Sequence, residues 1–179
     1  MNYKVKNIYG KTSDKKITVS VPGSKSITAR ALLIAALARG ESTLVNVQFS
    51  DDCATFLQCL KDLGIDCEVS DTTVKIQGCG GQIVKSEAEI YVGSAGTAAR
   101  FLPAFLAFQK GRYTLTCSDQ MKKRPLSSLI KTLEELGAKF TFLEEQNSYP
   151  FIIEGTDSPK TELTVNIDES SQFLSALLI

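Results

Sequence analysis

Apolar residues recur at helical spacing in several stretches of the chain, and a glycine follows three of them. This pattern is typical of helices that end one residue before a left-handed glycine. The predicted helices span residues 27–39, 53–63 and 126–136, and the glycines are Gly40, Gly64 and Gly137. Elsewhere apolar and polar residues alternate, which predicts strands with one buried face. These strands span residues 72–76 and 162–167, and a further apolar run (Ile17, Val19, Val21) precedes the first helix.

Residues that favour helix starts stand at the expected positions. Ser50 or Asp51 is suited to cap the helix over residues 53–63, and Pro125 suits the first turn of the helix that follows it. Pro103 lies several residues inside another apolar segment. Because a proline in a helix interior removes a hydrogen-bond donor, we expect it to kink this helix or to delay its start.

The order of these parts occurs twice, which predicts an internal repeat. Each copy has a Gly-Ser corner, an apolar helix with one arginine (Arg30, Arg100), a strand, a Ser-Asp pair, a second helix ending in Leu-Gly, and two strands. The units are therefore β-α-β-α-β-β, an α/β class, and we expect them to pack around shared helices. They span about 15–80 and 88–156, and an incomplete third begins at about 161, all within a single domain or partial domain. The apolar end "FLSALLI" suggests a truncated chain or half of a longer protein.

The corner before each apolar helix carries small or hydroxyl residues. The sequences are "GSKS", "GSAGT" and "DESSQ". Free backbone N–H groups and the positive end of the helix dipole bind anions at such positions. Lys25 adds a point charge to the first corner, Ser26 can cap the helix, and Arg30 adds a fork suited to phosphate or carboxylate. The residues also fit a plain alternative, in which Lys25 and Arg30 are solvated surface. The Walker glycine is missing, because Ser24 precedes Lys25.

The other two corners offer different groups. At the second, Gly96 lets a backbone approach a ligand closely and Thr97 can cap. At the third, Ser170, Ser171 and Gln172 offer hydroxyl and amide groups fit for a polyol. Each corner also fits an ordinary turn or capped helix. In "KKRP", Arg124 is held extended by the proline after it, so it is better oriented than the lysines before it.

Composition narrows the chemistry. The 179 residues carry a formal net charge of zero, with no histidine and five cysteines. A balanced charge disfavours nucleic-acid and membrane-surface partners. Without an export signal, we expect a cytoplasmic protein whose cysteines are reduced. The lack of histidine excludes His-based triads and His metal sites, and we expect neither a metal nor a cofactor.

Several of these stretches together resemble the enolpyruvyl transferase family. They are, in order, "PGSKSITAR", "SDD", "GSAGTAAR", "MKKRP", "LGA" and "SSQFLSALL". The "PGSKS" stretch points to the branch that acts on shikimate 3-phosphate. The resemblance implies an inverse α/β barrel-like domain. It also implies a reaction in which the 5-hydroxyl of shikimate 3-phosphate attacks phosphoenolpyruvate and phosphate then leaves.

The resemblance also implies roles for individual residues. Those for shikimate 3-phosphate are Lys25, Ser26, Arg30, Ser170, Ser171 and Gln172; those for phosphoenolpyruvate are Lys25, Gly96, Arg124 and Gln172, with Ser94 as an additional candidate. Two positions depart from the family pattern, because Ala29 and Ser94 stand where the family commonly has Asn. Ser94 keeps a polar side chain there.

The resemblance also implies a second domain, outside these 179 residues, that carries the groups for proton transfer. We therefore assign no catalytic residue, and expect the chain to supply a half-site that is inactive without a complementary C-terminal domain. Two alternatives stay open. One is a catalytically silent anion-binding half-protein. The other is a relative of the UDP-N-acetylglucosamine enolpyruvyl transferases, which carry a reactive cysteine that the present cysteines do not clearly match.

Overall fold

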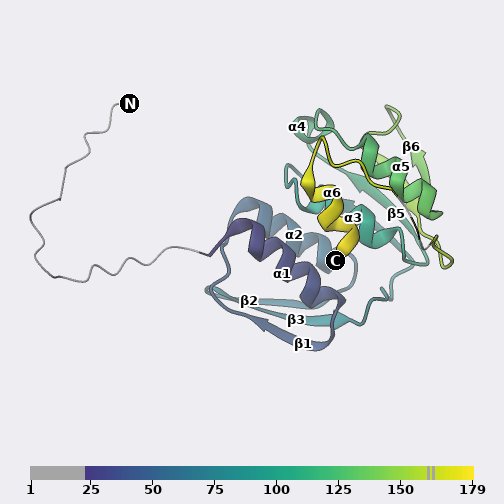
Figure 1. Cartoon of the computed structure of the whole chain (residues 1–179). Coiled ribbons are helices and arrows are strands. Elements are labelled where there is room, and N and C mark those ends of the chain that lie inside the picture. Colours follow the sequence, from purple (N-terminus) through teal and green to yellow (C-terminus); the bar gives the residue numbers. More distant parts are fainter. Residues whose placement is uncertain (1–22, 161, 163) are drawn as a thin grey trace, which may run out of the picture.

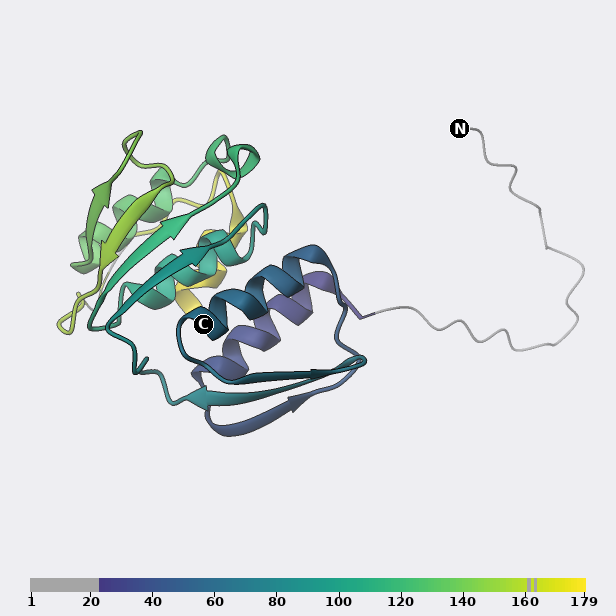
Figure 2. The same cartoon turned by 180° about the vertical axis from the view of Figure 1, so that it is seen from behind.

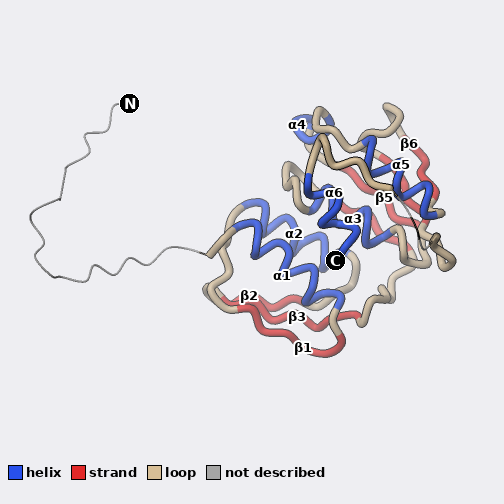
Figure 3. The backbone as a smooth tube through the Cα atoms, in the orientation of Figure 1, coloured by secondary structure: helices blue, strands red, loops and turns tan. Residues whose placement is uncertain are grey.

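A computed structural model describes residues 23–160, 162 and 164–179 of the chain (Figure 1). The N-terminal half contains a sheet of three antiparallel strands, in the order β1 (Arg39–Leu44), β3 (Thr73–Cys79), β2 (Cys67–Ser70). Helices α1 (Lys25–Leu37) and α2 (Asp51–Asp62) cover one face of this sheet (Figure 3). The apolar run Ile17, Val19 and Val21 lies outside the described residues.

The second half contains a sheet of four strands. Their order is β4 (Glu87–Tyr91), β5 (Arg112–Thr116), β7 (Phe151–Glu154), β6 (Lys139–Phe142). Strand β4 runs parallel to β5, and the other pairs are antiparallel. Helices α3 (Ala98–Leu106) and α5 (Ser127–Leu136) lie on one face of this sheet, which covers α3 when seen from behind (Figure 2). The short helix α4 (Asp119–Lys122) follows β5, and α6 (Ser171–Leu178) packs against α3.

The helices of both halves share one hydrophobic core. Helix α2 contacts both β4 and α3, and α3 in turn contacts α6. Every residue of α3 is buried, as expected for a helix surrounded by other elements on all sides. The largest fully buried side chains come from both halves: Phe56, Phe101, Tyr113, Phe151 and Phe173. This mixed architecture confirms the α/β class; the limits of the repeat units stay a prediction.

Helix α1 differs from the prediction at both ends. It begins at Lys25, and its N-cap is Ser24, whose Oγ accepts a hydrogen bond from Ile27 N at 3.4 Å. Ser26 lies inside the first turn, where its backbone is already helical, so it does not cap. The helix ends at Leu37, and Gly40 lies in β1 with φ 83°. The chain thus passes from helix to strand before it reaches this glycine.

The next two predicted helices are close to their expected bounds. Ser50 caps α2 by accepting a hydrogen bond from Cys53 N at 3.4 Å. Gly137 ends α5 with φ 114°, the left-handed conformation that favours glycine. Pro125 stands just before α5 instead of within its first turn, because Leu126 is the N-cap residue.

Helix α3 includes Pro103 without a delayed start. It begins at Ala98, and Thr97 makes no side-chain cap because its own backbone is helical. Pro103 has no N–H to donate to the carbonyl four residues earlier, that of Ala99. The buried Tyr149 hydroxyl donates to this oxygen at 2.8 Å. A side chain from the loop between β6 and β7 therefore replaces the helical hydrogen bond that the proline removes.

We expect Tyr149→Phe to lower the free energy of unfolding by about 1–3 kcal/mol, because it leaves the Ala99 carbonyl without this buried donor. Urea denaturation measures the change. Tyr91→Phe is the matched control, since Tyr91 is 57% exposed, and it should unfold like the parent. Equal unfolding of both variants would show that the Tyr149 hydroxyl does not support α3.

The strand predicted over residues 162–167 is wrong for the residues that the structure describes. Residues 164–167 are irregular, and 161 and 163 lie outside the described part. A strand needs a neighbour to complete its hydrogen bonds, and none of the described strands pairs with this segment. Among the described helices, none is both long and apolar enough to cross a membrane.

Candidate functional site

Two arginines connect the helices that follow the three predicted corners. Arg30 in α1 donates from Nη2 to Ser175 Oγ in α6 at 3.3 Å. Arg100 in α3 donates from Nη1 to Gln172 Oε1 in α6 at 3.1 Å. Helix α6 therefore lies next to both α1 and α3, as Figure 1 shows near the C-terminus.

Arg100 is the most buried cation of the site, with only 8% of its surface exposed. Its Nη1 also donates to Gly96 O at 3.1 Å, and its guanidinium lies 5.8 Å from the centroid of the Phe173 ring. The Nε atom is buried and has no hydrogen-bond partner. Burial first, and the nearby charge of Arg124 second, lower the pKa of Arg100. The positive charge is thus poorly compensated, which favours the approach of an anion.

Sequence reasoning did not assign Arg100 to the site. The available signal was the repeat, because Arg100 occupies the same place in the second unit that Arg30 occupies in the first. Arg100 was overlooked because its neighbours in the helix are apolar, which is typical of a purely structural core helix.

Gly96 lies between two guanidinium groups. A Cβ atom at this position would be 3.0 Å from Nη1 of Arg100 and 3.0 Å from Nη1 of Arg124. Because Gly96 has no side chain, its backbone approaches both cations without the crowding that a Cβ atom would cause. Arg124 itself is exposed. Its backbone N–H donates a hydrogen bond to Met121 O at 2.9 Å, which closes the turn after α4.

The first corner contributes a second cationic group. Arg30 donates from Nη1 to Ser26 O at 3.1 Å, and its guanidinium lies 5.4 Å from the Phe101 ring centroid in α3. Lys25 instead points to Asp52 in the first turn of α2, with Nζ and Oδ2 2.7 Å apart. Among the described ion pairs, none involves Arg30, Arg100 or Arg124.

The predicted hydroxyl residues are less uniformly placed. Ser170 caps α6, because its Oγ accepts a hydrogen bond from Gln172 N at 3.2 Å. Ser171 is exposed at the start of the same helix. Ser94 bonds to Ser118 at 2.7 Å between the two Oγ atoms, so its hydroxyl is engaged away from the arginines. Ser26 takes part through its carbonyl alone, and Ala29 is buried in α1.

Among the described residues, the thiols with raised pKa values and the buried tyrosine are poor candidates for a nucleophile or a base. Burial raises the pKa of Cys59 to about 12 and that of Cys117 to about 11, so both thiols stay protonated near neutral pH. Burial also raises the pKa of Tyr149 well above its usual value. The described arrangement therefore brings guanidinium groups and helix starts together, and groups of this kind suit anions.

Comparison with known proteins gives a consistent result. The family model described as EPSP synthase (3-phosphoshikimate 1-carboxyvinyltransferase) matches residues 10–179. A curated 3-phosphoshikimate 1-carboxyvinyltransferase of Trichormus variabilis is 42% identical over 164 residues, which are 90% of this chain and 38% of the relative. That of Photobacterium profundum is 43% identical over the same shares. The solved EPSP synthase from Acinetobacter baumannii matches with a TM-score of 0.79 at 27% identity, over 89% of this chain and 36% of that one. The chain thus spans about two fifths of the length of the relatives it matches.

Proposed function

Since the chain belongs to the EPSP synthase family, we propose that it takes part in the transfer of the enolpyruvyl group of phosphoenolpyruvate to the 5-hydroxyl of shikimate 3-phosphate, with release of phosphate. It supplies one half of the substrate site. Lys25, Ser26 and Arg30, together with Ser170, Ser171 and Gln172, bind shikimate 3-phosphate. Phosphoenolpyruvate binds to Lys25, Gly96, Arg124 and Gln172.

The observation that carries this proposal is the convergence of guanidinium groups that have no carboxylate partner among the described residues. Arg30 and Arg100 both contact α6, and Arg100 and Arg124 both reach Gly96. Two anionic substrates that react with each other must lie side by side. The electrostatic repulsion between them has to be offset before both can bind. Fixed cations at a partly desolvated surface stabilise such a pair without having to reorganise.

Gln172 has a central position in this arrangement. Its side-chain oxygen accepts from Arg100, which leaves the amide NH₂ group free to donate to a substrate oxygen. Arg100 therefore sets the orientation of an amide that the proposal assigns to both substrates. Ser94, whose hydroxyl is bonded to Ser118, is a phosphoenolpyruvate contact only if this bond opens.

We also propose that the chain does not turn over by itself. The described part of the site offers cations, hydroxyls and an amide, and the relatives are more than twice as long. The groups that move protons would then come from a complementary domain.

The test is a titration of the isotope-labelled chain with shikimate 3-phosphate, followed by NMR. Backbone amides at the starts of α1, α3 and α6 should all shift with one dissociation constant, because the three starts form one site. Shikimate without the phosphate is the control ligand and should cause much weaker shifts. Addition of phosphoenolpyruvate should then release no phosphate. Shifts at one helix start alone, or turnover like that of a full-length relative, would contradict the proposal.

A further inference from the structure

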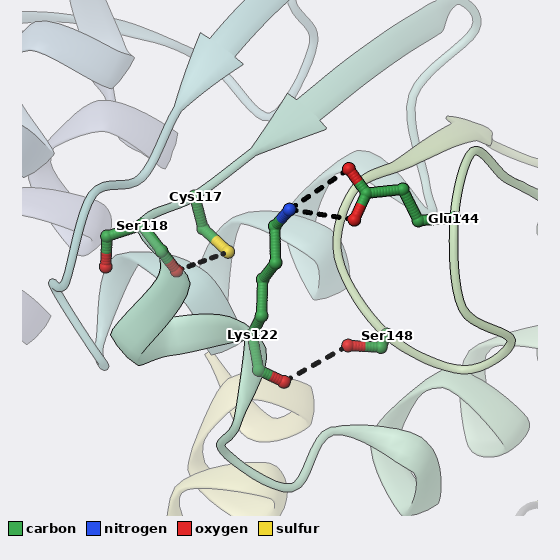
Figure 4. A network of polar contacts seen from close by, with 5 residues as sticks. All are labelled: Cys117, Ser118, Lys122, Glu144 and Ser148. Atoms are coloured by element: carbon green, nitrogen blue, oxygen red, sulfur yellow. Dashed lines mark hydrogen bonds and ion pairs between the residues drawn. The ribbon is translucent and has the colours of Figure 1, made fainter.

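The segment that carries Arg124 is held by the loop between β6 and β7. Figure 4 shows the contact, which involves both the side-chain ammonium group and the backbone carbonyl of Lys122. The ammonium group of Lys122 lies 2.8 and 3.0 Å from the two carboxylate oxygens of Glu144. The Ser148 hydroxyl donates to the backbone carbonyl of Lys122 at 3.2 Å. Two residues of the same loop therefore hold the side chain and the backbone of the last residue of α4.

The other end of α4 is attached to the corner that contains Gly96. Ser118 caps α4 by accepting from Met121 N at 3.3 Å, and its hydroxyl bonds to Ser94 at 2.7 Å. The backbone N–H of Ser118 donates to Gly93 O at 3.1 Å. The short helix is thus fixed between the corner on one side and the β6–β7 loop on the other.

Arg124 depends on these anchors for its position. It is exposed and, in the described part of the chain, it has no carboxylate partner. Its backbone follows Lys122 by two residues, and its guanidinium lies against Gly96. Among the described hydrogen bonds and ion pairs, none holds the Arg124 side chain close to the equally charged Arg100, whose repulsion acts to push it away.

We propose that Glu144 and Ser148 are positioning residues, which hold Lys122 so that Arg124 stays over Gly96 and receives phosphoenolpyruvate there. The role in binding rests on the proposed function; the positioning itself does not. A lone surface ion pair stabilises little, because two flexible side chains must be ordered to form it. Here a hydrogen bond to the backbone, from the same loop, restricts the same residue at a second point.

The experiment compares Glu144→Gln and Ser148→Ala with the parent chain. Glu145→Gln is the matched control, because Glu145 is an exposed neighbour without an ion pair among those described. The first readout is the NMR signal of the Arg124 Nε–H group in the ligand-free chain, identified by its loss in Arg124→Lys. It should shift or broaden in both variants and stay unchanged in the control.

The second readout is the affinity for phosphoenolpyruvate in the presence of saturating shikimate 3-phosphate. We expect each variant to weaken it about two- to fivefold, with unchanged affinity for shikimate 3-phosphate alone. A merely structural role would lower both affinities together. The charge-exchanged double variant, Lys122→Glu with Glu144→Lys, should recover most of the loss. In an Arg124→Ala background, Glu144→Gln should have no further effect on phosphoenolpyruvate binding.

The outcomes separate this proposal from the function on which it partly rests. If the Arg124 signal is the same in the variants and the parent, the positioning role is wrong. It is also wrong if the signal moves while the variants bind phosphoenolpyruvate as well as the parent does. If the parent binds no phosphoenolpyruvate, the proposed function fails, and the Arg124 signal alone decides whether the loop positions this residue.

Discussion

Replacing Phe173 by alanine is expected to lower the free energy of unfolding by about 3–5 kcal/mol, the usual cost of deleting a buried aromatic ring. Phe173 is fully buried in the shared core and is the main anchor of the short helix α6. Its ring also lies under the Arg100 guanidinium. A cavity here removes the packing of α6 on α3, and eight residues of helix do not persist in water without such packing.

The same change should weaken the binding of shikimate 3-phosphate, because Ser171 and Gln172 move with α6. Urea denaturation gives the stability, and hydrogen exchange shows whether α6 amides lose their protection. Phe108→Ala serves as the control, since Phe108 is 44% exposed, and it should change stability by less than about 1 kcal/mol. Retained α6 protection together with an unchanged unfolding midpoint would show that α6 is held by other contacts.

Arg100→Ala should weaken shikimate 3-phosphate binding about 30-fold or more, because it frees the Gln172 amide and removes a desolvated positive charge beside the site, and the loss of such a charge costs about 2 kcal/mol at least. Its effect on folding should be much smaller. The change leaves Gly96 O and Gln172 Oε1 without a donor, but it also removes a buried charge and its repulsion with Arg124. These terms oppose each other, so the binding loss exceeds the stability loss.

Calorimetric titration and thermal unfolding of the same samples measure both quantities. Arg39→Ala is the control, because Arg39 is exposed at the start of β1, and it should bind and unfold like the parent. Arg100→Lys should recover part of the affinity, since it keeps the charge but loses the fork. An Arg100→Ala chain that binds normally would remove Arg100 from the site.

Features that depend on neighbouring residues were predictable from the sequence. Ser50 and Gly137 act within one helical turn, and both have the predicted role. Whether Ser24 or Ser26 caps α1 does not depend on the neighbouring residues alone. A Cβ atom at Gly23 would clash with the backbone oxygen of Asn46, so the approach of a distant loop restricts the backbone just before the helix.

The errors and omissions in the site have the same origin. Pro103 fits inside α3 because Tyr149, far along the chain, donates to Ala99 O. Lys25 pairs with Asp52 because α1 packs against α2. A pattern of apolar residues predicts that helices pack, but it does not predict which of their polar side chains then meet. The residues alone pointed to Arg124 and Gln172, and the family resemblance supplied their substrates, whereas Arg100 was found only when the helices were placed in space.

The two guanidinium groups on either side of Gly96 put binding and folding in opposition at one position. In the empty chain they repel each other, so a change that neutralises one of them removes this repulsion as it weakens the site. Natural proteins commonly retain such conflicts, because selection favours activity and removes only variants whose stability falls below the threshold for function. Selection for heat resistance alone would therefore act against this repulsion, whereas selection for the activity would preserve it.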